Sequence, residues 1–236
     1  MNKGTLYLIP VPLGAGPAMA VLPATVCVRA KSLTHFVAEN AKSARAVLKS
    51  LSTDTPLQKI EIRELNNQTP NGALLELLSP LRQGTNVGLL SEAGCPAVAD
   101  PGSALVALAH HEGIRVVPLV GPSSILLALM ASGLNGQSFT FHGYLPTEAT
   151  AREKCLHDLE KSSRQERRTQ IFIETPYRNR QLLDALLKTC SPTTTVCVAT
   201  DLTLDSEQIR SRPVAEWRRL ALPDINRRPT VFLLQA

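Results

Sequence analysis

The chain of 236 residues is short of several features that would assign it a class at once. Aromatic residues make up only 4%, which disfavours a surface built for stacking bases. The five cysteines are scattered, with no Cys-x-x-Cys pair, so we expect reduced thiols in a cytoplasmic protein rather than a disulfide framework or a zinc site. The five histidines lack the spacing of metal ligands, and we expect no metal.

Long apolar runs are also missing. The N-terminal apolar run is broken by Pro10 and Pro12 and is too short for the core of a signal peptide. No other stretch reaches the length of a membrane span, so no membrane partner is expected.

Three common ligand motifs are absent too. Gly14-Ala15-Gly16 resembles the start of a dinucleotide fingerprint, but Met19 stands where the third glycine belongs. There is no phosphate-binding G-x-x-x-x-G-K-[ST] loop and no G-x-S-x-G nucleophile elbow, which argues against P-loop nucleotide chemistry and against a hydrolase of that type.

The most informative segment is Ser91 to Gly102, SEAGCPAVADPG. It lies between a buried strand and an Ala-rich helix, and it combines two glycines, two prolines and two carboxylates. Such a loop presents backbone groups to a ligand at the carboxyl end of a sheet, although a tight turn without a ligand is the alternative. Asp100 is interpreted as a cap of the following helix. Cys95 could be a nucleophile, but a residue of that size more often serves shape.

Periodicity predicts alternating strands and helices and therefore an α/β fold. A change of rhythm near Gly121 divides the chain into two α/β domains, 1–118 and 119–236. The predicted strands are 5–11, 26–29, 59–65, 86–90, 114–118, 138–142, 169–173, 194–199 and 230–235. The predicted helices are 38–51, 72–82, 103–112, 125–131, 152–161, 178–188 and 214–220, with Ser123 or Ser124 as a cap of the fourth.

The net charge is +5, and basic residues gather in two stretches, 152–168 and 207–228. Mixed runs of this kind are usually solvated helix faces. An anionic partner such as RNA is compatible with them.

Six segments, in order along nearly the whole chain, resemble the tetrapyrrole methylase superfamily of S-adenosylmethionine-dependent methyltransferases. Within it, the chain is similar to a short form of the branch that methylates a cytidine ribose 2′-oxygen in small-subunit ribosomal RNA. The segments are LYLIPVPLGAG (6–16), SEAGCPAVADPG (91–102), PLVGPSS (118–124), ASGL (131–134), FTFHGYLP (139–146) and ETPYR (174–178).

The resemblance implies two α/β domains with the cofactor in a cleft between them, commonly in a homodimer, with ribosomal RNA or the small subunit as partner. It also implies which residues hold S-adenosylmethionine, and S-adenosylhomocysteine as product. These are Pro12, Leu13, Gly14, Ser91, Glu92, Ala93, Gly94, Pro96, Gly121, Pro122, Ser123, Ser124, Glu174, Thr175, Ala199, Pro229 and Thr230.

In-line transfer of the methyl group to RNA is the leading hypothesis, with alignment and desolvation as the protein's main contribution. No residue is assigned as the catalytic base. Two alternatives stay open: a tetrapyrrole or other small metabolite as acceptor, and a cofactor-binding protein without catalysis. Candidates for proton removal or substrate positioning are Glu39, Lys42, His142, Glu174 and Arg178.

Overall fold

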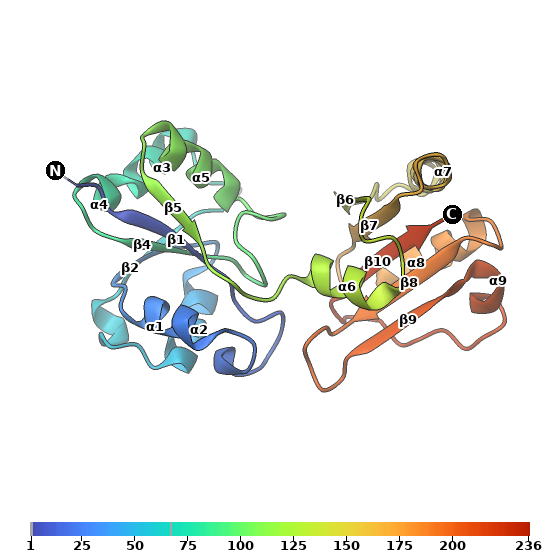
Figure 1. The fold of residues 1–236 in the computed structure, drawn as a ribbon, viewed down its shortest axis with the longest axis horizontal. Coiled ribbons are helices and arrows are strands. Elements are labelled where there is room, and N and C mark those ends of the chain that lie inside the picture. Colours follow the sequence, from blue (N-terminus) through green and yellow to red (C-terminus); the bar gives the residue numbers. More distant parts are fainter. Residues whose placement is uncertain (1, 67) are drawn as a thin grey trace. The chain divides into compact units, whose positions relative to one another are not determined.

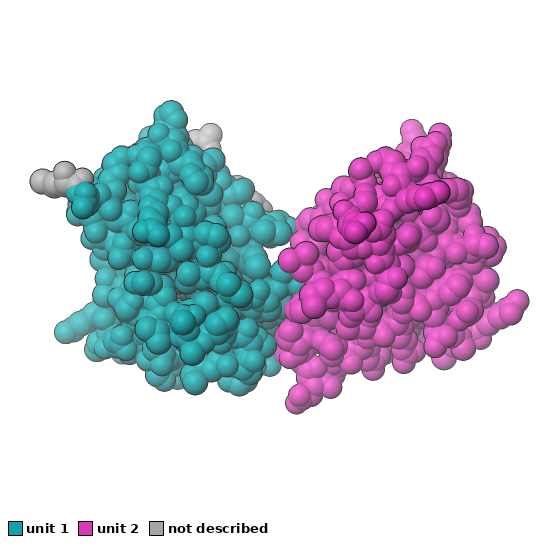
Figure 2. All heavy atoms as spheres, in the orientation of Figure 1, with its two compact units in different colours: residues 1–123 teal, residues 124–236 magenta. Residues whose placement is uncertain are grey.

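The computed structural model describes residues 2–66 and 68–236, apart from the side chain of Asn71. The chain forms two compact units, residues 1–123 and 124–236, which are coloured separately in Figure 2. The division follows Ser123, a few residues beyond the boundary predicted at 118.

The first unit is built on a five-stranded sheet of order β3-β2-β4-β1-β5. All four neighbouring pairs are parallel, as the alternation of strands and helices predicted. Because the strands are parallel, their carboxyl ends lie at one edge of the sheet. The strands are β1 (Thr5–Ile9), β2 (His35–Ala38), β3 (Glu61–Glu64), β4 (Val87–Leu90) and β5 (Arg115–Pro118).

Helices cover both faces of this sheet, with α1 and α2 on one side and α3 and α5 on the other (Figure 1). Side chains alternate between two cores along the central strands, as Ile9 and Leu6 of β1 show. The helices are η1 (Ala18–Ala20), α1 (Ala24–Lys31), α2 (Ala41–Leu51), η2 (Leu57–Lys59), α3 (Asn71–Leu77), α4 (Ser79–Arg82) and α5 (Gly102–His111).

Two predictions for this unit were wrong. The segment Val26 to Arg29, predicted as a strand, lies in helix α1. Val26 and Ala30 are buried there on one face, whereas Val28 is 66% exposed, so packing against the core overrides the β-propensity of a short Val-rich run. The helix predicted from Ala38 begins at Ala41, because Ala38 ends the unpredicted strand β2 and Asn40 caps α2.

The predicted helix 72–82 is divided in the structure into α3 and α4. Leu78 ends the first helix and Pro80 stands in the first turn of the second. Proline is tolerated in the first turn of a helix but not in its interior, which accounts for the division.

The second unit contains a mixed sheet of order β6-β7-β10-β8-β9, in which only β6 and β7 are parallel. Strands β7 and β10 were predicted with their observed bounds, and β9 was missed. The strands are β6 (Phe139–Tyr144), β7 (Thr169–Ile173), β8 (Thr195–Thr200), β9 (Gln208–Pro213) and β10 (Thr230–Gln235).

The core of this unit lies between the sheet and helices α7, α8 and α9. Trp217, 1% exposed, donates from its indole Nε1 to the carbonyl of Val196 at 2.9 Å. The four predicted helices are present as α6 (Ser124–Ser132), α7 (Ala149–Glu166), α8 (Asn179–Thr189) and α9 (Val214–Trp217).

Candidate functional site

Loops at the carboxyl edge of the first sheet bring together most of the residues predicted to bind a cofactor in this unit. Pro12 to Gly14 follow β1, and Glu39 follows β2. The segments Ser91 to Pro96 and Gly121 to Ser123 follow β4 and β5. Ligands of α/β proteins bind outside this edge of a parallel sheet, so the fold places these loops where a ligand is expected.

The first and third of these loops are joined by backbone hydrogen bonds. The N–H of Val11 donates to the carbonyl of Gly94 at 2.9 Å, and the N–H of Gly94 donates to the carbonyl of Val11 at 3.2 Å. The hydroxyl of Ser91 also donates to the carbonyl of Gly94, at 2.9 Å. Gly94 has φ +70°, and a Cβ there would lie 3.1 Å from Leu13. This junction therefore requires glycine.

The loop after β5 packs closely against the same junction. A Cβ on Gly121 would lie 2.3 Å from the Cβ of Pro10, so only glycine permits this approach. The thiol of Cys95 lies 3.4 Å from the carbonyl oxygen of Pro122. Burial raises the pKa of the Cys95 thiol, which disfavours the thiolate that a nucleophile needs. Cys95 thus acts as a small packing residue between the loop after β4 and the loop after β5.

Asp100 fixes the remainder of the loop after β4. Its Oδ1 accepts from the N–H of Gly102 at 2.6 Å and from the N–H of Ala97 at 3.1 Å. Ala97 and Ala99 have φ of 64° and 54°, a left-handed conformation that costs a residue with a Cβ about 1–2 kcal/mol. Two such residues, separated by Val98 alone, persist only where the surrounding contacts hold them, which is typical of functional loops. The prediction that Asp100 caps α5 was wrong, because Pro101 occupies the cap position, but the Asp100 side chain does hold the loop through these two hydrogen bonds.

A hollow of about 250 Å³ opens beside the loop after β1. Its wall comes from that loop, from the carboxylate-bearing loop after β4, and from helix α2. The volume is close to that of a small ligand site. The lining residues are Pro12, Leu13, Gly14, Ala15, Gly16, Ala46, Val47, Ser50 and Glu92.

Three carboxylates gather at this edge and give it negative charge. Burial raises the pKa of Glu39, and the nearby carboxylates of Asp100 and Glu92 raise it further. The hydroxyl of Ser43 donates to Glu92 Oε1 at 2.5 Å. An edge with this charge is complementary to a cationic ligand.

Residues 124–236 hold the other predicted site residues, among which Glu174 is buried and bonded to two neighbours in the chain, Thr175 and Arg178. The Glu174 side chain is 1% exposed, and its Oε1 accepts from Arg178 at 2.8 and 3.0 Å. The same oxygen accepts from the N–H of Thr175 at 2.6 Å. The guanidinium of Arg178 also lies 5.3 Å from the centre of the Tyr177 ring. Arg178 is thereby held in one orientation at the start of α8.

The remaining predicted residues of this unit lie on neighbouring strands. Ala199 of β8 pairs with Val231 of β10 and is 1% exposed, so only its backbone could meet a ligand. The hydroxyls of Thr230 and Thr200 lie 3.2 Å apart, and the carbonyl of Pro229 accepts from the N–H of Asp201 at 2.9 Å.

His142 lies on β6 with its Nε2 2.6 Å from Oε1 of Gln170. Lys42 is in the first turn of α2, where its N–H donates to the side chain of Asn40. Among the described residues, neither forms a hydrogen bond or an ion pair with another of the candidates.

Helix α2 supplies site residues that the sequence alone did not indicate. Ser43, Ala46, Val47 and Ser50 are small residues on one side of an ordinary amphipathic helix. Their spacing of three and four residues is a weak signal, because it is equally typical of a helix that packs against a core.

Across residues 2–66 and 68–236, no group of three or more His, Cys, Asp or Glu side chains is placed to hold a metal ion. In the same residues no helix combines the length and the apolarity needed to cross a membrane. The five cysteines are free thiols.

The parallel sheet, the small-residue loops at its carboxyl edge and the second, mixed sheet define an α/β protein with a candidate ligand site at that edge. The sequence profile of the tetrapyrrole (corrin/porphyrin) methylases matches residues 5–217. The chain belongs to this family and is a methyltransferase.

Relatives at about one-third identity cover nearly the whole chain. The "Ribosomal RNA small subunit methyltransferase I" of Vibrio cholerae is 31% identical over 97% of this chain and 75% of its own length. The protein of the same name from Pseudomonas aeruginosa is 32% identical over 96% and 76%. Among solved structures, the methyltransferase CobJ matches with a TM-score of 0.64 at 19% identity, covering 100% of this chain and 94% of that one. The cobalt precorrin-4 methyltransferase CbiF matches at 0.62 and 15%, covering 98% and 94%. These structures share the fold.

Proposed function

We propose that the protein transfers a methyl group from S-adenosylmethionine to a ribose hydroxyl of small-subunit ribosomal RNA. The observation that carries the choice of acceptor is the similarity, over nearly the whole chain, to proteins named as small-subunit ribosomal RNA methyltransferases. The likeness to CobJ and CbiF supports only the fold, so it gives no separate support to a tetrapyrrole acceptor.

The loops of the first unit fit this cofactor. S-adenosylmethionine carries a sulfonium and an ammonium group, and the carboxylates of Glu39, Glu92 and Asp100 supply the opposite charge. The hollow beside Pro12 to Gly16 is lined mainly by small side chains, which leave backbone groups accessible to a ligand. When bound, the cofactor supplies a methyl group on an activated leaving group.

The protein's own contribution is to align and desolvate the acceptor and to remove the proton of its hydroxyl group. Of the five residues considered for proton removal or positioning, Glu39 lies at the carboxyl edge, directly after strand β2. Its raised pKa makes it a stronger base than an ordinary carboxylate, and we propose that it accepts the proton of the hydroxyl. Glu174 and Arg178 bind each other, and this supports a positioning role for Arg178 toward an anionic substrate.

The contributions of Glu174, Thr175, Ala199, Pro229 and Thr230 to cofactor binding follow from the family resemblance and remain a prediction. So do a homodimer and a cytoplasmic location, where ribosomal subunits occur. Sedimentation of the purified protein over a range of concentrations tests for the homodimer.

The deciding experiment incubates the purified protein with radiolabelled S-adenosylmethionine and small ribosomal subunits that lack ribose methylation. We expect label in the RNA, at one nucleotide, and release of S-adenosylhomocysteine. The matched control is Glu39→Gln, which keeps the size of the side chain but cannot accept the proton and should label the RNA much more slowly.

Tight cofactor binding without label in RNA would refute the proposed acceptor. Tetrapyrroles and small metabolites would then be tested in its place with the same labelled cofactor. If the Glu39→Gln variant is as active as the natural protein, Glu39 is not the base. That result would not affect the proposal that RNA is the methyl acceptor.

A further inference from the structure

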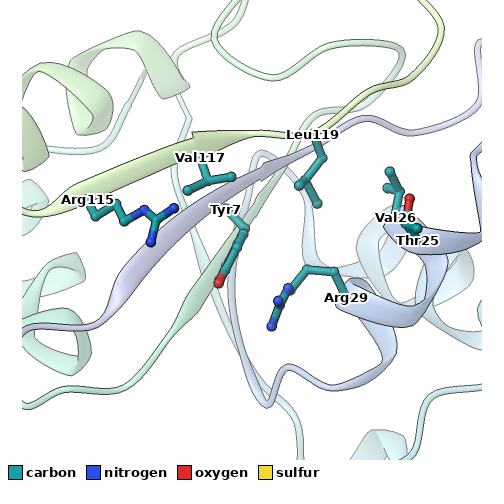
Figure 3. A pocket seen from close by; sticks show the side chains of 7 residues that line it. All are labelled: Tyr7, Thr25, Val26, Arg29, Arg115, Val117 and Leu119. Carbon is teal, nitrogen blue, oxygen red and sulfur yellow. The ribbon is translucent and has the colours of Figure 1, made fainter.

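A second pocket of the first unit lies between the edge strand β5 and helix α1. It shares no lining residue with the hollow beside Pro12 to Gly16. It has a volume of about 350 Å³. Figure 3 shows the guanidinium groups of Arg29 and Arg115 on either side of the Tyr7 ring. The other lining residues are Thr25, Val26, Val117 and Leu119.

The geometry of β5 and α1 explains why these residues meet. Arg115 and Val117 are two residues apart on β5 and so share one face of the strand, and Leu119 follows just beyond its end. Tyr7 of β1 is the register partner of Val117 and therefore points to the same face. On α1, Thr25 and Arg29 are four residues apart and lie on one side of the helix.

The charge of this pocket is not balanced by the protein. In the part of the chain that the structure describes, neither Arg29 nor Arg115 is in an ion pair with a carboxylate. By contrast, the basic stretches 152–168 and 207–228 contain ion pairs in Arg164–Glu160, Arg168–Glu166, Arg212–Glu216 and Arg228–Asp201. Two arginines without an ion-pair partner thus share one pocket, which the sequence did not single out.

The Tyr7 ring orients one of these cations. The guanidinium carbon of Arg29 lies 4.6 Å from the centre of the ring, which holds the group by a cation–π interaction and leaves its N–H donors free for a ligand. The hydroxyls of Tyr7 and Thr25 add donors, and the apolar floor of Val117 and Leu119 strengthens any charged hydrogen bond above it.

We infer that this pocket binds the phosphate group of a nucleotide. A phosphate offers several acceptor oxygens to two guanidinium groups and two hydroxyls, and guanidinium groups bind it bidentately. The pocket exceeds the needs of phosphate alone, and its apolar floor suits the attached sugar. The nucleotide comes from an RNA backbone or from a free mononucleotide. The RNA source rests on the proposed function, whereas the phosphate site does not.

The position of β5 supports an RNA backbone as the source of the phosphate. This strand begins at Arg115 and ends at Pro118, and Leu119 of the pocket follows it directly, two residues before Gly121 of the next loop. An RNA strand bound here would therefore extend along β5 toward that loop.

The test compares Arg29→Gln/Arg115→Gln with Arg210→Gln/Arg219→Gln. The second pair removes the same charge from two exposed arginines that have no side-chain partner among the described residues. Melting temperatures confirm folding of both. Binding of a labelled single-stranded RNA is measured by anisotropy over a range of salt concentrations that includes about 0.1 M. Binding of adenosine monophosphate and inorganic phosphate is measured by calorimetry at about 0.1 M salt.

We expect the first pair to weaken RNA and mononucleotide binding by roughly tenfold or more and to reduce the salt slope of RNA binding by about 0.7 for one lost phosphate contact. The control pair should change the affinity for RNA and the affinity for the mononucleotide by less than about twofold each, the range of a general charge effect. Loss of mononucleotide binding with unchanged RNA binding would assign the site to a free nucleotide.

Equal losses in both pairs, or no loss in either, would overturn the inference. Tyr7→Phe keeps the ring beneath Arg29 and should weaken binding less than the double change. Methyl transfer to RNA is measured on the same samples. Its absence in the natural protein would refute the proposed function, while the comparison of mononucleotide binding would still decide the phosphate site.

Discussion

Val11 and Gly94 exchange two backbone hydrogen bonds, of 2.9 and 3.2 Å, and so join the loop after β1 to the loop after β4. The first loop borders the hollow and the second carries Glu92, so this pair sets the distance between two walls of the candidate cofactor site.

Gly94→Ala should therefore weaken both folding and cofactor binding. Alanine at φ +70° costs about 1–2 kcal/mol, and its Cβ would press on Leu13 at 3.1 Å. Denaturant unfolding and calorimetric titration with S-adenosylmethionine measure the two effects. Gly136→Ala is the control, because a Cβ there meets nothing within 4 Å. Unchanged cofactor affinity in Gly94→Ala would show that this junction does not shape the site.

Asp100→Ala should loosen the loop that ends at α5. The change leaves the N–H groups of Ala97 and Gly102 without their acceptor, which costs about 1 kcal/mol, as does loss of a capping side chain. Hydrogen exchange should become faster at both amides. Asp158→Ala, at an exposed position of α7, should leave stability and exchange unchanged. Equal effects of the two changes would argue against a specific role for Asp100.

Arg178→Ala should lower the melting temperature, because it leaves the buried carboxylate of Glu174 without its cationic partner. Arg180→Ala on the same helix removes an exposed ion pair with Asp184 and should have little effect. Fluorescence of Trp217, the single tryptophan of the chain, follows unfolding of residues 124–236. RNA methylation at natural rates by a folded Arg178→Ala protein would exclude Arg178 from substrate positioning.

Glu39 should make stability fall as the pH rises. Its pKa in the folded protein is raised above the ordinary value of 4.5, so the folded state binds the proton more tightly than the unfolded state. The contribution of Glu39 to stability is then fully present below pH 4.5 and is lost as the pH rises from there through the raised pKa.

Glu39→Gln removes this dependence. It should stabilise the protein at pH 7 by a few tenths of a kcal/mol, the scale of a partly exposed charge interaction. Denaturant unfolding at pH 4 and pH 7 measures the difference, which should shrink at the lower pH. A difference that grows toward pH 4 would contradict the assigned direction of the shift.

Local pattern was sufficient for much of the fold. Strands β7 and β10 are short, nearly continuous apolar runs and helix α8 is an amphipathic segment, and the sequence predicted all three almost to the residue. The loop 91–102 was also evident, because glycine, proline and aspartate act on their own backbone within a few residues.

Tertiary contacts decided the rest. The segment Val26 to Arg29 has strand-like composition but is helical because Val26 and Ala30 pack into the core on one face. Strand β9 carries mainly polar residues, and pairing with β8 makes it a strand.

The same division holds for the sites. The sequence by itself determined the family, the α/β class and the loops rich in small residues, because these depend on residues close together in the chain. The charge around Glu39 and the pocket of Tyr7, Arg29 and Arg115 were decided only by the tertiary structure. Their members come from different strands and helices, and only the packing of the sheet and its helices brings such residues within reach of one another.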